Sequence, residues 1–446
     1  MHYLTNSAVQ FALNLPSAGN YVCIRTLENY VALMKFEEEK GELARDLFHK
    51  ITAELCEILE QNVSKQRLDS THVFSDMATF GRTRLMGVTI KRFLTQLKRH
   101  DLEALTSLPA ELVQRYDRSS AGLFAEVSEP EDRARLRLEV ARDLNTLIRR
   151  FENDENHQHR DTFKCMCRIF NEQCEIVEDT IDIKQKPGGD CMQNPSDPEA
   201  TYDGHKGPGY QVQLAETFDS SNETQLITAL LPQTAVESDA GALDELMAQW
   251  VANGLMPEQA QMDTHYGHDA NDQLCLANGI DMISPVPGPK VDTSLLNSDD
   301  FPVDDTGKII SCPAGVVPET SKHDPETGET SITMPASDCS NCDFADECPI
   351  RAMKNGGYGA TFSGQQQRLD RRRREEETDG FKEIYRKRSG IEATNSSMKR
   401  RTGMSRLRVR GSPSVFLAII FKVIGWNILR AAGTKKMRLH LQAKQG

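Results

Sequence analysis

Apolar residues recur at helical spacing over long stretches of the chain, and these stretches predict helices. The pattern runs through 7–60, where acidic residues take the opposite face, and again through 84–100 and 133–151. An apolar residue at every third or fourth position places a stripe along one side of a helix, which can then pack on a core. Pro109 and Pro130 interrupt the second pattern. We therefore expect N-terminal helices, then a first strand, and after that strand a helical insertion that contains the second pattern.

Shorter segments rich in β-branched and apolar residues predict strands. They are 175–183, 209–218, 224–232, 260–263 and 281–286. Between them, 239–254 has helical periodicity and ends at a glycine, which is typical of a helix terminus. Strands that alternate with helices indicate an α/β fold. Periodicity supports no finer description.

The last third contains three segments of contrasting character. Residues 285–338 are rich in Pro, Asp, Gly, Ser and Thr without a clear period, so we expect loops or an irregular subdomain. The highly charged 368–388 is predicted to be helical, either as a solvated helix or as a contact to a phosphate backbone. Residues 413–432 are long and apolar enough for a membrane span, but Lys422 and Arg430 interrupt them. We expect a buried amphipathic helix that packs on the central sheet, and no membrane association.

Charge is divided unevenly along the 446 residues. The net formal charge is −13, yet residues 351–446 hold 23 Lys and Arg against 7 Asp and Glu, a net of +16. The remainder holds 30 against 59, a net of −29. Because screening limits the reach of each charge to about 10 Å at moderate salt, a local basic region can bind phosphates despite the acidic total. The sequence offers no secretory signal pattern, and we expect a cytoplasmic protein.

Four cysteines have a spacing that suggests a metal site. Cys312, Cys339, Cys342 and Cys348 form C-x26-C-x2-C-x5-C. A cytosolic protein rarely keeps disulfides, and four thiolates suit tetrahedral zinc. The alternative is four reduced thiols that pack as small apolar groups. We take structural Zn²⁺ as the expectation, in a Cys-rich insertion that is otherwise rich in loops.

A second cluster of polar residues falls near the C-terminus. Tyr385, Arg388, Glu392 and Lys399 are offset by 3, 7 and 14 positions, which places them within an arc of roughly 60° on one helix. A carboxylate flanked by cations suits a site that holds a metal ion against a phosphodiester. The alternative is a solvated face with an ion pair between Arg388 and Glu392. Spacing alone favours that alternative.

The spacing Y-x2-R-x3-E-x6-K resembles the C-terminal signature of DDE transposases from bacterial insertion sequences. The segment 66–74 resembles the first acidic strand of that family, with Asp69, and 260–271 resembles the second, with Asp263. The segment 205–217, which contains Lys206, is similar to the family's Lys-Gly-x-Gly-Tyr strand. The resemblance extends over most of the chain, and four motifs in the right order give it its specificity.

The resemblance implies an RNase H-like core in which Asp69, Asp263 and Glu392 are the catalytic acids. They would hold two Mg²⁺ ions, with Mn²⁺ as a substitute, and Asp69 would bridge the pair. The implied DNA contacts are Tyr385, Arg388, Lys399 and Lys206. Two departures are visible: many relatives have Gly where His265 stands, which predicts a clash beside Asp263, and we expect the N-terminal helical region to be incomplete.

The expected fold class is therefore α/β, an RNase H-like mixed sheet flanked by helices, with a helical insertion and a Cys-rich insertion. We expect this division of the chain: N-terminal helices 1–60, first catalytic strand 61–84, helical insertion 85–160, core 161–290, Cys-rich insertion 291–360, C-terminal core helices 361–435 and basic tail 436–446.

The resemblance also implies a function and partners. The expected activity is metal-dependent cleavage of phosphodiesters at the ends of an insertion sequence, followed by strand transfer to target DNA. The partners would be the terminal inverted repeats, target DNA and further copies of the chain in a DNA-bound homo-oligomer, at the nucleoid of a bacterial cytoplasm. The rival is an impaired, truncated transposase that only binds DNA. A hydrolase of RNA or of repair intermediates on the same fold is a third reading, because a fold does not define its substrate.

Overall fold

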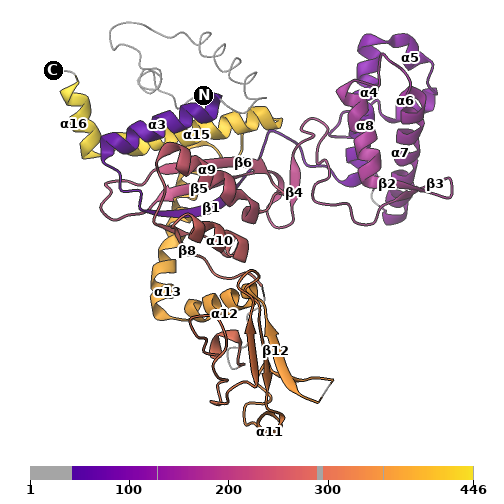
Figure 1. The fold of residues 1–446 in the computed structure, drawn as a ribbon. Coiled ribbons are helices and arrows are strands. Elements are labelled where there is room, and N and C mark those ends of the chain that lie inside the picture. Colours follow the sequence, from indigo (N-terminus) through magenta and orange to yellow (C-terminus); the bar gives the residue numbers. More distant parts are fainter. Residues whose placement is uncertain (1–42, 128, 289–294, 355, 445–446) are drawn as a thin grey trace.

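The computed structural model describes residues 43–127, 129–288, 295–354 and 356–444, and its centre is a mixed β-sheet (Figure 1). Of the predicted N-terminal helices, 44–59 falls within α3 (Leu43–Leu59), and positions 7–42 lie outside the described residues. The strands of the sheet are β1 (Lys65–Val73), β4 (Thr201–Asp203), β5 (Gly207–Thr217), β6 (Ile227–Thr234), β7 (Gln259–Gln261) and β8 (Asp281–Ile283).

The strand β1 is central, and its two neighbours run in opposite senses. It pairs antiparallel with β5, which in turn pairs with β6 and β4. On the other side β1 pairs parallel with β7, and β7 with β8. Parallel strands end at the same edge of a sheet, so residues that follow β7 lie near the second half of β1. Both predicted aspartates fall in this area.

Helices cover the sheet because their apolar stripes match its faces. The helices α3 and α15 (Ser412–Ala432) lie side by side across it, and α9 (Leu243–Asn253) packs on β6 (Figure 1). As predicted, α9 ends at Gly254, which adopts a left-handed conformation. The described residues contain one helix long and apolar enough to cross a membrane, α15. Its fully buried Asn427 accepts from the backbone N–H of Ile227 and donates to the same residue's carbonyl, so the prediction that it packs on the sheet is confirmed.

The predicted helical insertion forms a separate bundle with its own apolar cluster (Figure 1). Its helices are α4 (Arg82–His100), α5 (Leu102–Thr106), α6 (Ala110–Arg115), α7 (Pro130–Phe151) and α8 (Asp161–Gln173). The hairpin of β2 (Cys174–Val177) and β3 (Thr180–Ile183) is the predicted β segment 175–183. Its two strands pair with each other and not with the central sheet. The strand β2 begins directly after α8.

The segment that we expected to be irregular contains a second antiparallel sheet. Its strand order is β11 (Arg351–Ala352), β12 (Tyr358–Phe362), β10 (Thr330–Met334), β9 (Thr320–His323). The short helix α11 (Ala336–Cys339) lies at its far end, away from the core (Figure 1). The prediction of loops was therefore wrong for β9 and β10. Hydrogen bonds between strands order this segment, although its sequence has no clear period.

The zinc prediction for this insertion is not supported. Within the described parts of the chain, no three His, Cys, Asp or Glu residues are grouped so that they could hold a metal ion. Burial and the neighbouring thiols raise the pKa of Cys339 and of Cys348. Cys312, Cys339 and Cys348 pack in a small core with apolar side chains such as Phe301 and Ile332, while Cys342 is half-buried. That core and the four-strand sheet both contribute to the stability of the insertion.

Three helical segments lead from the insertion back to the core. They are α12 (Gly364–Glu376), α13 (Asp379–Tyr385) and α14 (Gly390–Thr402), with the 3₁₀ turn η4 (Arg386–Ser389) between the last two. The expected single helix from Tyr385 to Lys399 is thus interrupted. The backbone stays right-handed throughout, because residues 385, 386, 389 and 390 all have helical angles. The tighter 3₁₀ turn shifts the helix face without ending the helical path.

Candidate active site

Asp69 lies in the middle of β1 and not at a strand end, directly opposite Leu214 of β5. Its side chain is 16% exposed. Burial raises the pKa of Asp69 to about 6; the Arg388 guanidinium opposes that shift, and the carboxylates of Asp263, Glu392 and Asp239 add to it. Electrostatic influence at this level requires that these acids lie near one another. Asp263 and Glu392 thus lie within electrostatic reach of Asp69.

Asp263 follows β7 by two residues, because β7 ends at Gln261. It caps the 3₁₀ turn η2 (Thr264–Tyr266), and its Oδ1 accepts from the backbone N–H of His265 at 2.5 Å. Among the described residues, His265 is not one of those with a positive φ. This turn therefore does not need the left-handed backbone freedom that a glycine would give at position 265.

Glu392 lies in the first turn of α14 and is the most open of the three acids. Its side chain is 62% exposed, and its Oε1 accepts from Nη2 of Arg388 at 3.0 Å. The other terminal nitrogen, Nη1, lies 3.5 Å from Oδ1 of Asp69 and makes no hydrogen bond in the described structure. The guanidinium therefore lies between two acids that come from opposite ends of the chain.

This arrangement has a direct consequence for metal binding. No three carboxylates within the described ranges are grouped closely enough to hold an ion, even though three are neighbours. The donor set fits Mg²⁺, which prefers carboxylate oxygens. The guanidinium supplies the positive charge that an ion would supply, and its Nη1 and the Oδ1 of Asn395 are buried without a hydrogen-bond partner there.

Tyr385 lies beside Arg388 at the end of α13. Its ring stacks on Phe381 with centroids 5.7 Å apart, and the Arg388 guanidinium carbon is 5.8 Å from the Tyr385 ring centre. Burial raises the pKa of Tyr385, and the nearby Asp263 contributes in the same direction. The phenol therefore lies on the Asp263 side of the acid cluster.

A buried ion pair fixes α14 against the sheet. Nε and Nη2 of Arg67 donate to Oε2 of Glu216 at 2.8 and 2.6 Å, and Thr394 donates to the other carboxylate oxygen at 2.7 Å. Arg67 also donates to the carbonyl of Lys387 at 3.1 Å. A Cβ at Gly390 would lie 2.0 Å from Nη1 of Arg67, so this approach requires glycine. These contacts position Glu392 near Asp69.

The remaining predicted DNA contacts lie on another side of Asp69. Lys206 is exposed, and its Nζ lies 3.4 Å from the hydroxyl of Ser70. Burial lowers the pKa of Lys399, and the charge of Lys206 lowers it further while Asp69 opposes both. The two lysines are therefore close together. Like charges this close suit an anionic ligand.

The arginine-rich helix α12 differs from the predicted DNA contact. Five of its arginines form ion pairs: Arg368 with Asp269, Arg371 with Asp299, Arg372 with Asp272, Arg373 with Asp370, and Arg374 with Asp299 and Asp300. These acids belong to α10 (Asp269–Ala277), to η3 (Ser298–Asp300) and to α12 itself. The helix therefore joins the core to the insertion.

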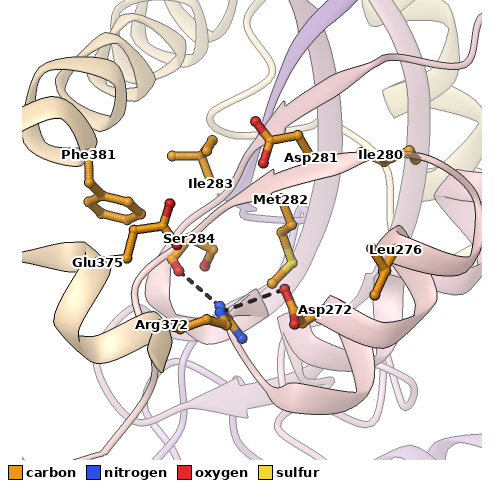
Figure 2. A pocket seen from close by; sticks show the side chains of 10 residues that line it. All are labelled: Asp272, Leu276, Ile280, Asp281, Met282, Ile283, Ser284, Arg372, Glu375 and Phe381. Carbon is orange, nitrogen blue, oxygen red and sulfur yellow. Dashed lines mark hydrogen bonds and ion pairs between the residues drawn. The ribbon is translucent and has the colours of Figure 1, made fainter. Parts of the chain in front are cut away.

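A pocket of about 160 Å³ lies along this joint (Figure 2). It is lined by Asp272, Leu276, Ile280, Asp281, Met282, Ile283, Ser284, Arg372, Glu375 and Phe381. Arg372 crosses it, 3.6 Å from Asp272, and donates to the Ser284 carbonyl at 3.0 Å. None of the three clustered acids lines it. The pocket belongs to the packing of α12 on β8.

Sequence reasoning missed two polar residues at the site. Asn395 donates to Oδ2 of Asp69 at 3.0 Å, and it follows Glu392 by three positions, a spacing that could have revealed it. Asp239 accepts from Ser70 at 3.1 Å and from Gln213 at 2.6 Å. No motif marks Asp239, because its place depends on how the turn after β6 folds back on β1.

Comparison with known proteins identifies one part of the chain. Residues 311–432 match the family described as Transposase DDE domain. The match ends with α15 and includes Glu392, but neither Asp69 nor Asp263. No curated protein matches the chain significantly. Among solved structures, a piggyBac transposase synaptic complex with hairpin DNA is similar over 80% of this chain and 67% of that chain, at 11% identity and a TM-score of 0.25. The family match thus confirms the resemblance to DDE transposases over 311–432.

Proposed function

We propose that the protein is a DNA transposase that cleaves phosphodiesters at the ends of a bacterial insertion sequence and transfers the strands to target DNA. The observation that carries the proposal is the meeting of Asp69, Asp263 and Glu392 around Arg388, from segments far apart in the chain. The match of 311–432 to a transposase domain supports it. The mixed sheet, with Asp69 on β1 and Asp263 just after its parallel neighbour, supports an RNase H-like core.

In this proposal Asp69, Asp263 and Glu392 would hold Mg²⁺ or Mn²⁺ through their carboxylate oxygens. When bound, such ions make the attacking hydroxyl more acidic and neutralise the phosphate. The residues of the chain then orient the substrate. Arg388 leaves the acids to grip a phosphate oxygen, and Tyr385 positions the strand near the cut. Lys399 and Lys206 bind backbone phosphates, which orients DNA but conveys little sequence information.

We also propose the partners and the setting of this reaction. The terminal inverted repeats and the target DNA would lie over the acid cluster, and copies of the chain would assemble on DNA in the bacterial cytoplasm. The division into N-terminal helices, catalytic core, helical insertion and Cys-rich insertion is part of this proposal. The zinc site is not part of this proposal.

The second candidate is an impaired transposase that binds DNA without cutting it. It is favoured by one observation, the position of Arg388 between Asp69 and Glu392, which keeps the described acids from grouping around an ion. The two candidates share the DNA surface. They differ in whether divalent ions displace the guanidinium.

Cleavage of DNA that flanks the gene tests the proposal, because short inverted repeats there would supply the substrate. A supercoiled plasmid that carries both flanks is incubated with the full chain and Mg²⁺, and nicked, linear and joined products are separated on a gel. We expect ends with 3′ hydroxyls and strand joining.

Asp69→Ala, Asp263→Ala and Glu392→Ala should each abolish cutting and preserve DNA binding. Asp281→Ala, on the edge strand of the same sheet, is the matched control and should cut at the parental rate. Parental cutting by Glu392→Ala would refute the assignment, and binding without cutting by the wild type would establish the second candidate.

A further inference from the structure

An aromatic pair lies where β1 leaves the sheet, beyond the acid cluster. The rings of His72 and Phe74 meet edge to face with centroids 4.6 Å apart. His72 is 7% exposed, whereas Phe74 is 36% exposed. A large apolar ring that is held by a neighbour and still open to solvent is a surface on which a flat group can stack.

Two glycines make room for these rings. Gly207 and Gly209 have φ of +95° and +148°, a region that side chains rarely adopt. A Cβ at Gly209 would lie 2.6 Å from the Val73 carbonyl and 3.1 Å from the His72 ring, and one at Gly207 would lie 4.0 Å from the Phe74 ring. The start of β5 thus passes closely beneath the rings. This gives a physical reason for the Gly-Pro-Gly sequence.

Positive charge surrounds the pair. The chain at 405–407 runs beside Phe74, whose N–H donates to the Ser405 carbonyl at 3.1 Å and whose carbonyl accepts from Leu407 at 2.7 Å. Arg406 is therefore the bridge partner of Phe74, and it is exposed without an acidic partner in the described structure. Lys206 and Lys399 lie near enough to His72 to act on its charge. Arg406 thus lies beside the open Phe74 ring, and Lys206, Lys399 and the acid Asp203 lie within electrostatic reach of His72.

His72 offers a second sign of a ligand. Its Nε2 lies 3.3 Å from the Pro208 carbonyl, to which it donates as a neutral ring. Its Nδ1 is buried and has no hydrogen-bond partner among the residues described. Buried polar atoms are normally paired, so an unpaired one beside an open ring suggests that a bound group completes the site.

We propose that Phe74, with His72 behind it, stacks an unpaired base of the cut DNA strand, while Lys206, Lys399 and Arg406 bind its phosphates. The inference rests on the proposed function, and it specifies the form of the substrate. Base stacking on an aromatic ring is tolerant of sequence because every base has a flat face. The shelf formed by these five residues would recognise a frayed or single-stranded end and not a particular base.

The position of the shelf sets a length for the single strand. Phe74 follows Asp69 by five residues of extended chain, a span of about 17 Å. At about 3.4 Å per nucleotide along one strand, this corresponds to roughly five stacked nucleotides. Because an odd offset along a strand turns side chains to opposite faces, this length is a minimum path. We therefore expect a tail of six unpaired nucleotides to approach Phe74 and a tail of two to fall short.

Binding of tailed duplexes tests the inference. A fluorescent 30-base-pair duplex is prepared blunt, with a tail of two thymidines and with a tail of six, on each strand polarity in turn. Fluorescence anisotropy in EDTA measures affinity for the full chain, so catalysis does not enter. The wild type should bind the six-nucleotide tail of one polarity about tenfold more tightly than the blunt duplex, the size expected for one stacked base.

Phe74→Ala should remove that preference and leave blunt-duplex affinity unchanged, while Phe74→Trp should keep it. Phe344→Ala, at a ring of similar exposure in the insertion, is the matched control and should behave as the wild type. Arg406→Ala should weaken binding of all three duplexes. Thermal unfolding and gel filtration of each variant show whether it folds and assembles as the wild type does.

The outcomes separate this inference from the proposed function. A wild type without tail preference, or Phe74→Ala with the full preference, overturns the inference even if Mg²⁺-dependent cutting is observed. A Phe74-dependent preference without any cutting supports the inference and removes the catalytic proposal. A changed oligomeric state of Phe74→Ala with unchanged tail binding assigns the ring to contact between copies, which also overturns it.

Discussion

Two basic regions of the molecule are opposite in behaviour. In α12 five arginines form ion pairs with acids of the core, of the insertion and of the helix itself. At the acid cluster and the shelf, Lys206, Lys399 and Arg406 have no acidic partner within 4 Å among the described residues. The first region is neutralised and structural. The second keeps positive charge available for phosphates.

The difference teaches that a run of arginines does not by itself mark a DNA surface. Apart from Asp370 of the helix itself, the acids that neutralise α12 come from positions 269–300, which are remote in sequence, so its own composition could not reveal them. The acid cluster shows the reverse case. There the single guanidinium of Arg388 lies beside the carboxylates of Asp69 and Glu392, so their negative charge is only partly neutralised. Three substitutions test this contrast.

Arg372→Ala should have the largest effect, on stability. Its side chain is 12% exposed and donates to the carbonyls of Gly267 and Ser284 at 3.0 Å each. Loss of two charge-assisted bonds to buried carbonyls should lower the free energy of unfolding by about 2–3 kcal/mol. Urea denaturation measures it. Arg371→Ala removes an exposed pair at 3.7 Å and should change stability by less than about 1 kcal/mol. Equal effects of the two would refute the distinction.

Asp69→Asn should stabilise the metal-free protein at alkaline pH. The folded pKa of Asp69, about 6, is above its ordinary value of 3.8, so the charged carboxylate is disfavoured in the folded state. That cost is absent below about pH 4, develops as pH rises through 6 and reaches at most about 3 kcal/mol. We expect Asp69→Asn to raise the free energy of unfolding by about 1–2 kcal/mol at pH 8 and to leave it unchanged near pH 4. Denaturation in EDTA at each pH measures this difference.

Asp281→Asn, at an exposed carboxylate, is the control and should show no such pH-dependent gain. If Asp69→Asn instead destabilised the protein at pH 8, the ion pair with Arg388 would outweigh burial, and the acid cluster would resemble α12.

Lys399→Ala should have the smallest effect on stability and a specific effect on binding. If Lys399 neutralises one phosphate, its loss should make the slope of log affinity against log salt shallower by about 0.9. Affinity at low salt should fall by a few-fold, measured by anisotropy on a blunt duplex. Arg371→Ala should leave the slope unchanged, because that arginine is paired. An unchanged slope for Lys399→Ala would place it outside the phosphate contacts.

Much of the fold followed from periodicity. The helices at 84–100 and 133–151, the helix that ends at Gly254 and the strands β5 to β8 were all predictable, because each has a strong apolar period or a clear stop signal. The sheet in the insertion was not, since its strands are short and lie between Gly- and Asp-rich turns. Residues 175–183 were predicted to be β structure, but the sequence pattern did not show that they form a hairpin beside the helical bundle.

The candidate site was predictable in its residues more than in its geometry. Asp69, Asp263, Glu392 and Arg388 followed from spacing and resemblance, and the structure brings them together. The helix break at 386–389 was missed, because the sequence remains helical in character there and Arg67 and Gly390 act from tertiary contact. The four cysteines had suggestive spacing, yet three of them, Cys312, Cys339 and Cys348, pack in an apolar core and no metal group is found among the described residues.

The sequence by itself determined which segments are helices and strands, where the acids and the basic residues lie along the chain, and the family that residues 311–432 resemble. These depend on local periodicity and on short motifs. Only the tertiary structure decided which charges are neutralised, that a guanidinium stands between Asp69 and Glu392, and that Phe74 remains open beside Arg406. The reason is physical: the strength of a charge or of an exposed ring depends on neighbours within a few ångströms, and here those neighbours come from hundreds of residues away.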